Sequence, residues 1–309
     1  MFTHNIQSFG AFEKHIFSNS SGDAFEVTPQ YGACLLDLRF GGMSVLDGYK
    51  TPEDLIANKW SKNIILAPFP NRLANGTYTH LDKTYQFPLN NAATNNAIHG
   101  FCKDVPMTVI ATWHNENEGG LTCRWQDEGT HQAYPFRFTL EVTMILRGGA
   151  FEMKMGFKND DTEVIPVGMG WHPYFIMSNK SNETSLQMPY CQRIIIDEKM
   201  LPTGKISRFT RFQTLKKIKK IVLDNGFKLS PRGKIAETIL QSERGKLTFW
   251  QEKGAGKWNF LQVFTPPHRK SIAIEPMTCN IDAFNNNDGL TWLEPTELLE
   301  GRFGVRFEK

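Results

Sequence analysis

Hydrophobic and polar side chains alternate with a period of two through much of the chain, most clearly between residues 136 and 158. Every second side chain from 136 to 146 is hydrophobic, and the alternation resumes after Gly148-Gly149. The hydrophobic positions are Phe136, Phe138, Leu140, Val142, Met144, Leu146, Phe151, Met153, Met155 and Phe157. Successive side chains of a strand point to opposite faces, so this pattern is typical of half-buried strands. Because glycine adopts a positive φ easily, the segment predicts an antiparallel hairpin.

Shorter runs of the same kind recur along the chain and are separated by turn residues. They are ACLLDLRF (33–40), KTYQFPL (83–89), LTCRWQD (121–127), RIIID (193–197), KLTFWQE (246–252), NFLQVFT (259–265), SIAIEP (271–276) and RFGVRFE (302–308). The best helix candidate is TPEDLIANKW at 51–60, where a proline and two acidic residues follow a threonine, as at a helix start. Strands without intervening helices predict an all-β protein, a large antiparallel β-sandwich with few short helices. No linker interrupts the pattern, so residues 1–309 are expected to form a single domain.

Composition and charge then exclude several classes of function. The net charge is only +3, which gives no general attraction to nucleic acid or to an anionic membrane. No run approaches the roughly 18 apolar residues of a membrane span. The five cysteines have no CxxC spacing and the first residues do not form a signal-peptide pattern, which predicts a cytoplasmic location. The KKIKK run at 216–220 is interpreted as a solvated face, with the binding of an anionic substrate as the alternative.

Two loops contain side chains suited to hydrogen bonding with a ligand. Asn71 and Arg72 lie in APFPNRLANG, and the arginine presents a fixed fork of donors that suits carboxylates or several hydroxyls. His99 follows the asparagine-rich stretch NNAATNNAI, and asparagine offers both donors and acceptors. The structural alternatives are a salt-bridged surface arginine and an ordinary polar loop.

Two further places hold titratable groups in apolar surroundings. His172 lies within the aromatic run GMGWHPYF, and Pro173 steers it away from a helix and towards an extended conformation. Glu275 is expected at the end of the strand SIAIEP, before an irregular loop. A core histidine with a satisfied hydrogen bond and an exposed glutamate are the alternatives for these two residues.

Spacing argues against two other kinds of chemistry. The eight histidines include no HxH or HExxH pattern, so no metal site is predicted. There is no GxSxG elbow and no activating signature around a cysteine, so nucleophilic catalysis is not supported. Histidine and carboxylate remain, which is the equipment of general acid–base catalysis without a cofactor.

Several segments, in this order, together resemble the aldose 1-epimerase (galactose mutarotase) family. They are ILAPFPNRLANGTYTHLDKTYQFPLNNAATNNAIHGF (65–101), GWHPYF (170–175), LPTG (201–204), LDNGF (223–227), LQVFTPP (261–267), SIAIEPMTCNIDAFN (271–285) and a final strand pair around LLEGRFGVRF (298–307). The form of EPMTCNIDAFN is similar to the epimerase-related subgroup of that family.

This resemblance implies a mutarotase-like supersandwich with a sugar cleft, and it assigns roles to individual residues. Glu275 would be the general base that deprotonates the anomeric hydroxyl, and His172 the general acid that protonates the ring oxygen. The sugar would be bound by Arg72, His99, Asp224, Asn71 and Gln262. The expected activity interconverts the α and β anomers of a free aldohexose such as galactose or glucose, in a monomer or homodimer that uses no cofactor.

Two alternatives remain within the same fold. A hexose-6-phosphate 1-epimerase would need a cationic pocket, for which Arg72, Lys103 and the KKIKK run are the candidates. A sugar-binding protein without catalysis would not need a matched acid and base, so the presence of both His172 and Glu275 speaks against it.

Overall fold

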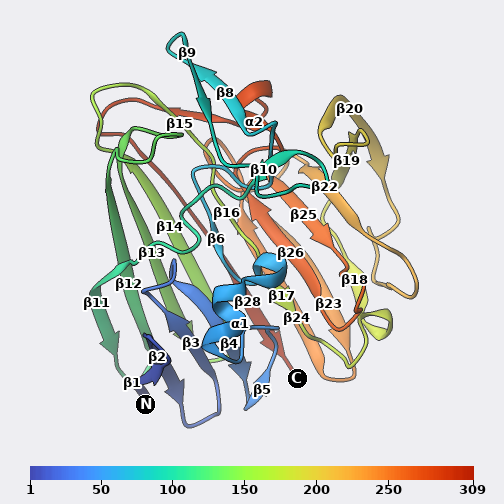
Figure 1. Cartoon of the computed structure of the whole chain (residues 1–309). Coiled ribbons are helices and arrows are strands. Elements are labelled where there is room, and N and C mark those ends of the chain that lie inside the picture. The colour runs from blue at the N-terminus through green and yellow to red at the C-terminus, as the bar shows by residue number, and fades with distance from the viewer.

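The computed structural model describes residues 1–309 and consists almost entirely of antiparallel strands arranged in two large and several small sheets (Figure 1). The all-β prediction is therefore confirmed. In Figure 1 strands β11 to β14 of the nine-stranded sheet lie on the left, β19 and β20 lie on the right, and the hairpin of β8 and β9 lies at the top.

The nine-stranded sheet contains the hairpin predicted from the alternation at residues 136–158. Its strands in spatial order are β11 (Thr108–His114), β12 (Glu118–Glu128), β13 (Arg137–Arg147), β14 (Ala150–Asn159), β28 (Leu298–Glu308), β24 (Gly245–Glu252), β23 (Ile235–Ser242), β18 (Ser185–Gln187) and β21 (Lys216–Lys217). Arg147 pairs with Ala150 across the turn, where Gly149 has a φ of 68°. Every hydrophobic position of the alternation is buried. β28 is one continuous strand, so the expectation of a strand pair around LLEGRFGVRF is wrong. Pairing with β14 on one side and β24 on the other keeps the whole segment extended.

The eight-stranded sheet is built from segments that are far apart in the sequence. Its strands are β20 (Pro202–Phe209), β19 (Cys191–Ile196), β22 (Asp224–Leu229), β25 (Phe260–Phe264), β26 (Ile272–Met277), β16 (Gly170–Trp171) and β6 (Ile65–Leu66), with β17 (Tyr174–Phe175) also paired to β26. β26 is an interior strand, and its neighbours on both sides contribute to the candidate site described below.

The remaining elements are short apart from the N-terminal sheet. That sheet consists of β1 (Phe2–Phe9), β2 (Phe12–Asn19), β3 (Ala24–Thr28), β4 (Cys34–Phe40) and β5 (Met43–Ser44). Three small sheets pair β7 (Arg72–Ala74) with β10 (Asn96–Ile98), β8 (Thr77–His80) with β9 (Lys83–Gln86), and β15 (Ile165–Val167) with β27 (Thr291–Leu293). The helical segments are α1 (Pro52–Ala57), α2 (Ala283–Asn286) and the 3₁₀ turns η1 (Lys59–Ser61) and η2 (Ser181–Glu183).

Helix α1 begins where the sequence predicts it. The Thr51 hydroxyl accepts a hydrogen bond from the Asp54 N–H at 3.1 Å, which satisfies one of the free donors of the first turn. The helix ends at Ala57, and the chain continues into η1 through Asn58 in the left-handed conformation. No helix in the protein combines the length and the apolar character needed to cross a membrane.

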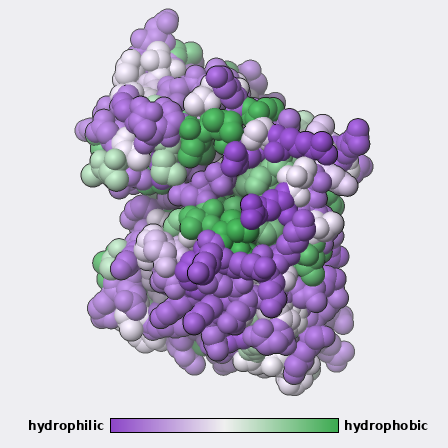
Figure 2. Space-filling model, turned by 90° about the vertical axis from the view of Figure 1, so that its right-hand side faces the viewer, coloured by the Kyte–Doolittle hydropathy of each residue, from purple (hydrophilic) through white to green (hydrophobic).

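A hydrophobic core of 61 buried residues joins the two large sheets. Side chains such as Leu140 and Met153 enter it from the nine-stranded sheet, and Leu261 and Ile274 enter it from the eight-stranded sheet. Trp171 belongs to this core and stacks on Phe303 with ring centroids 5.3 Å apart. The face on the side of β19 and β20 is mostly hydrophilic, with hydrophobic side chains gathered in a hollow across its middle (Figure 2).

Candidate active site

Glu275 is buried in the middle of β26, with only 1% of its surface exposed. The expectation that it ends its strand is wrong, because β26 continues through Pro276 to Met277. The strand is paired with β25 on one side and with β16 and β17 on the other, and these partners keep it extended although proline contributes no N–H. The carboxyl group therefore belongs to the rigid interior of a sheet.

His172 lies opposite Glu275 because of the register between their strands. Gly170 pairs with Met277 and Tyr174 with Ala273, so the residue between them on one strand faces the residue between them on the other. His172 Nε2 is 3.5 Å from Glu275 Oε1. The pairing with β26 is interrupted at His172, between β16 and β17. The His172 N–H instead donates to the Ile64 carbonyl at 3.1 Å.

Asp224 and Gln262 extend the site along the same sheet. Gln262 is the direct partner of Glu275 across β25 and β26, and Gly226 of β22 is the partner of Gln262. Gln262 Nε2 donates to Asp224 Oδ1 at 2.8 Å.

Asn71, Arg72 and His99 reach the site from the small sheet of β7 and β10. The Asn71 N–H donates to His99 Nδ1 at 3.3 Å, and the His99 N–H donates to the Asn71 carbonyl at 2.9 Å. Asn71 Oδ1 accepts from an Arg72 guanidinium nitrogen at 3.2 Å, which orients that side chain. Because Nδ1 of His99 is an acceptor, the neutral ring carries its hydrogen on Nε2.

A cavity of about 340 Å³ brings these seven residues together. That volume is within the usual range for small-molecule sites, about 300–1,000 Å³. The seven predicted site residues all line it, namely Asn71, Arg72, His99, His172, Asp224, Gln262 and Glu275. Sequence reasoning missed the other lining residues, which are Trp60, Ser61, Asn91, Ile98, Tyr174 and Phe264. Tyr174 and Phe264 lie inside GWHPYF and LQVFTPP, two of the segments that carry the family resemblance, which could have indicated them. Nothing in the local pattern distinguishes Trp60.

Polar atoms that have no partner in the protein are concentrated at this cavity. Arg72 Nε, His172 Nδ1, Gln262 Oε1 and Glu275 Oε2 are all buried and make no hydrogen bond. Buried polar groups are normally paired, and each unpaired one costs about 1–3 kcal/mol. Their donor and acceptor character suits a ligand that carries several hydroxyl groups.

Burial determines the protonation of the acid–base pair. The pKa of Glu275 is raised well above its usual value by burial and then by Asp224, and Arg72 opposes the shift. Burial lowers the pKa of His172 to about 3. Both shifts favour the uncharged pair, in which one proton is held on Glu275. Its transfer to His172 produces the carboxylate and the imidazolium without any change in net charge.

The neighbouring groups are also shifted by burial. The pKa of His99 is lowered well below its usual value by burial, and then by His172 and Arg72. Burial raises the pKa of Asp224, while Arg72 and a hydrogen bond from Gln262 oppose that shift. Arg72 is therefore the cation that the cavity presents to a ligand.

The other basic candidates do not line the cavity. Lys103 forms an ion pair with Asp104 at 3.0 Å. In the KKIKK run the lysines are exposed and only Ile218 is buried, which agrees with a solvated face. A larger groove of about 1310 Å³ lies over β14, β28, β24 and β23, where Arg306 pairs with Glu237 and Arg147 with Glu152.

Comparison with known proteins agrees with this fold. A galactose mutarotase-like protein from Clostridium acetobutylicum superposes with a TM-score of 0.87 at 20% identity, covering 100% of this chain and 98% of that one. Galactose 1-epimerase from Lactobacillus acidophilus gives a TM-score of 0.83 at 17% identity, covering 100% and 98%. These likenesses define a galactose mutarotase-like fold.

The sequence places the chain within a family of that fold. Residues 20–306 match the aldose 1-epimerase family, and the chain belongs to it. The Escherichia coli K12 protein YihR, itself described as uncharacterized, is 27% identical over 303 residues, covering 94% of this chain and 93% of that protein.

Proposed function

We propose that the protein is an aldose 1-epimerase that interconverts the α and β anomers of a free aldohexose such as galactose or glucose. The observation that carries the proposal is the buried pair of His172 Nε2 and Glu275 Oε1, 3.5 Å apart in a cavity with unpaired polar atoms. Mutarotation acts on the ring oxygen and the anomeric oxygen, which are bonded to the same carbon and therefore lie close together. An adjacent acid and base fit this pair of atoms.

In the proposed reaction, ring opening moves one proton onto the enzyme and another onto the sugar. Glu275 as carboxylate removes the proton of the anomeric hydroxyl, and the electrons of that bond form the new carbonyl. The bond between the anomeric carbon and the ring oxygen breaks, and His172 as imidazolium protonates the ring oxygen. Rotation about the bond next to the carbonyl and reversal of both transfers give the other anomer, with every proton returned.

The effect of burial on the pair suits this cycle. Ring opening converts carboxylate and imidazolium into carboxylic acid and imidazole, which is the form that the buried site favours. Starting from the neutral pair, the open-chain complex has the same protonation state of Glu275 and His172, so burial favours this proton-transfer step without shifting the overall equilibrium. A positioned acid or base typically contributes about 10²–10⁴-fold to the rate.

The charge of the cavity favours a free sugar over a sugar phosphate. Among the residues that line the cavity, Arg72 is the only lysine or arginine, and its guanidinium interacts with Asp224 and Glu275. A phosphate, with a charge of about −1.5 to −2, would have to compete with Asp224 for that one cation. The test is the rate of anomer exchange, followed by polarimetry, with α-D-glucose, α-D-galactose and glucose 6-phosphate. Action on the phosphate alone would refute the proposal.

The roles of the pair are tested by replacing each member with a neutral group of similar shape. Glu275→Gln and His172→Asn are each expected to lower kcat at least 100-fold while sugar binding stays measurable by calorimetry. Glu243→Gln, in the exposed turn between β23 and β24, is the matched control and should keep the wild-type rate. Rates like those of the wild type in either site variant would show that the roles are wrong.

A further inference from the structure

Trp60 lines the same cavity as His172 and Glu275, yet the proposed reaction gives it no role. It lies in η1, between α1 and β6, and its side chain is half-buried. Its ring is 6.0 Å from that of Phe264, which also lines the cavity, and 6.0 Å from that of His268. Trp60 and Phe264 are therefore neighbouring aromatic residues in the lining of the cavity.

The backbone that carries Trp60 is held in an uncommon conformation. Trp60 has a φ of 69°, and Asn58, Ser61 and Asn63 also have positive φ values, of 45°, 52° and 60°. Such angles are rare for bulky side chains, and they persist where the surroundings enforce them, often at ligand sites.

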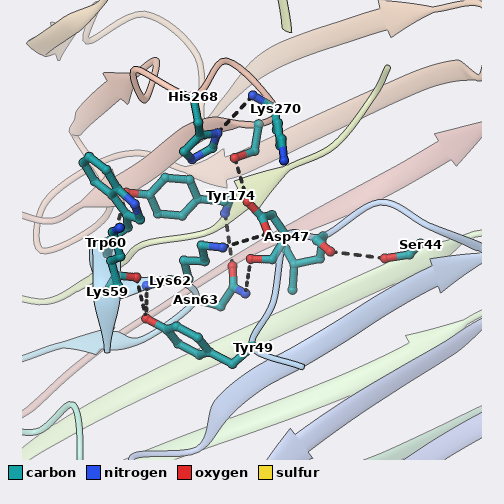
Figure 3. Close-up of polar contacts among 12 residues, drawn as sticks. Ser44, Asp47, Tyr49, Lys59, Trp60, Lys62, Asn63, Tyr174, His268 and Lys270 are labelled. Atoms are coloured by element: carbon teal, nitrogen blue, oxygen red, sulfur yellow. Dashed lines mark hydrogen bonds and ion pairs between the residues drawn. The ribbon is translucent and has the colours of Figure 1, made fainter. Parts of the chain in front are cut away.

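A polar network fixes this segment (Figure 3). The Tyr49 hydroxyl accepts from the Lys62 N–H at 2.9 Å and donates to the Lys59 carbonyl at 3.0 Å. Lys62 Nζ pairs with Asp47 Oδ1 at 2.8 Å, and Asn63 Nδ2 donates to the Asp47 carbonyl at 3.2 Å. The turn is thus braced on both sides of Trp60, which limits the positions that the indole can take.

Tyr174 connects this turn to the proposed acid. Its hydroxyl donates to the Trp60 carbonyl at 2.9 Å, and its ring stacks on His172 with centroids 4.9 Å apart and planes 5° apart. Figure 3 draws Trp60 beside Tyr174 at one end of the network. Tyr174 therefore contacts both the turn that carries Trp60 and the proposed general acid, His172.

We propose that Trp60 is a sugar-contacting, specificity-determining residue, whose indole packs on the C–H face of a pyranose ring, and that Tyr174 is the positioning residue that holds it there. This inference rests on the proposed function. A cavity lined by both aromatic and hydrogen-bonding side chains suits a sugar, which has an apolar face and hydroxyl groups. The site then selects aldopyranoses with an uninterrupted C–H face.

The first test measures the binding of D-galactose and D-glucose by calorimetry, beside steady-state kinetics. Trp60→Ala and Trp60→Gly are expected to raise Kd and KM for the preferred sugar about ten-fold or more, with kcat changed less than about three-fold. Trp60→Phe should give an intermediate loss. Glycine adopts a φ of 69° without strain, so a weakened Trp60→Gly variant cannot be attributed to backbone strain at this position. Trp292→Ala, an exposed tryptophan on β27, is the control and should bind normally.

The second test separates positioning from catalysis. Tyr174→Phe keeps the ring that stacks on His172 and removes the hydroxyl that holds Trp60, so KM should rise several-fold while the pH profile of kcat stays unchanged. Wild-type Kd values in both Trp60→Ala and Trp60→Gly would overturn the inference and leave the proposed function intact. Binding that depends on Trp60 without any anomer exchange would overturn the proposed function alone. A wild type that binds neither sugar would overturn both.

Discussion

Replacing His172 with asparagine should make the fold more resistant to mild acid, although it removes the proposed general acid. The pKa of this histidine is 6.5 in the unfolded chain and about 3 in the folded protein, because burial disfavours the imidazolium. Below pH 6.5 the unfolded state therefore binds a proton that the folded state does not. The free energy of unfolding is therefore unaffected by the titration of His172 above pH 6.5 and decreases as the pH falls from 6.5 towards 3.

The size of the effect follows from the pKa difference. Between pH 7 and pH 5 the wild type should lose about 2 kcal/mol of unfolding free energy through this residue, at about 1.4 kcal/mol per pH unit below 6.5. The total lost by pH 3 approaches about 5 kcal/mol, which is of the same order as the stability of many proteins. The His172→Asn variant has no titratable group at this position, so its unfolding free energy should decrease less on acidification, by the same amount.

The assay is urea unfolding followed by tryptophan fluorescence at pH 7 and pH 5. The readout is the change in unfolding free energy between the two pH values, compared between wild type and variant, so a constant offset from the substitution cancels. His114→Asn, at the exposed end of β11, controls for the removal of a histidine as such. Equal pH dependence in wild type and His172→Asn would mean that His172 takes up its proton as readily in the fold as in the unfolded chain, and that burial does not lower its pKa.

Three further outcomes follow from the same geometry. Glu275→Gln should be more stable than the wild type, by a margin that grows as the pH rises. The pKa of the buried carboxyl group is raised, so its ionisation at higher pH is unfavourable in the folded state. Thermal unfolding at pH 6 and pH 9 measures this margin, and an equal margin at both pH values would contradict the prediction. Arg72→Ala should lower kcat/KM about 10–100-fold, as expected for a charge-assisted hydrogen bond of about 1.5–3 kcal/mol, and a smaller loss would exclude a direct contact with the sugar. Asn63→Ala should lower the unfolding free energy by about 1–3 kcal/mol, since the buried N–H of Tyr174 donates to Asn63 Oδ1 at 3.1 Å; an unchanged urea midpoint would show that the N–H finds another partner.

Local pattern was sufficient for those strands and turns whose conformation depends on neighbouring residues. The alternation at 136–158 and its glycine pair predicted the β13–β14 hairpin with the correct buried face. Thr51 and Pro52 predicted the start of α1. The end of β26 was not predictable in the same way, because β25, β16 and β17 keep the strand extended past Glu275.

The sequence by itself determined the strand-and-turn character of the chain and the residue types available for acid–base chemistry. Its resemblance to a known family also identified seven of the residues that line the cavity. Only the tertiary structure decided that His172 faces Glu275 at 3.5 Å, because the pairing of β16 and β17 with β26 joins segments about a hundred residues apart. The burial that shifts their pKa values, and the turn that brings Trp60 into the cavity, likewise arise from packing between distant segments, which local periodicity does not encode.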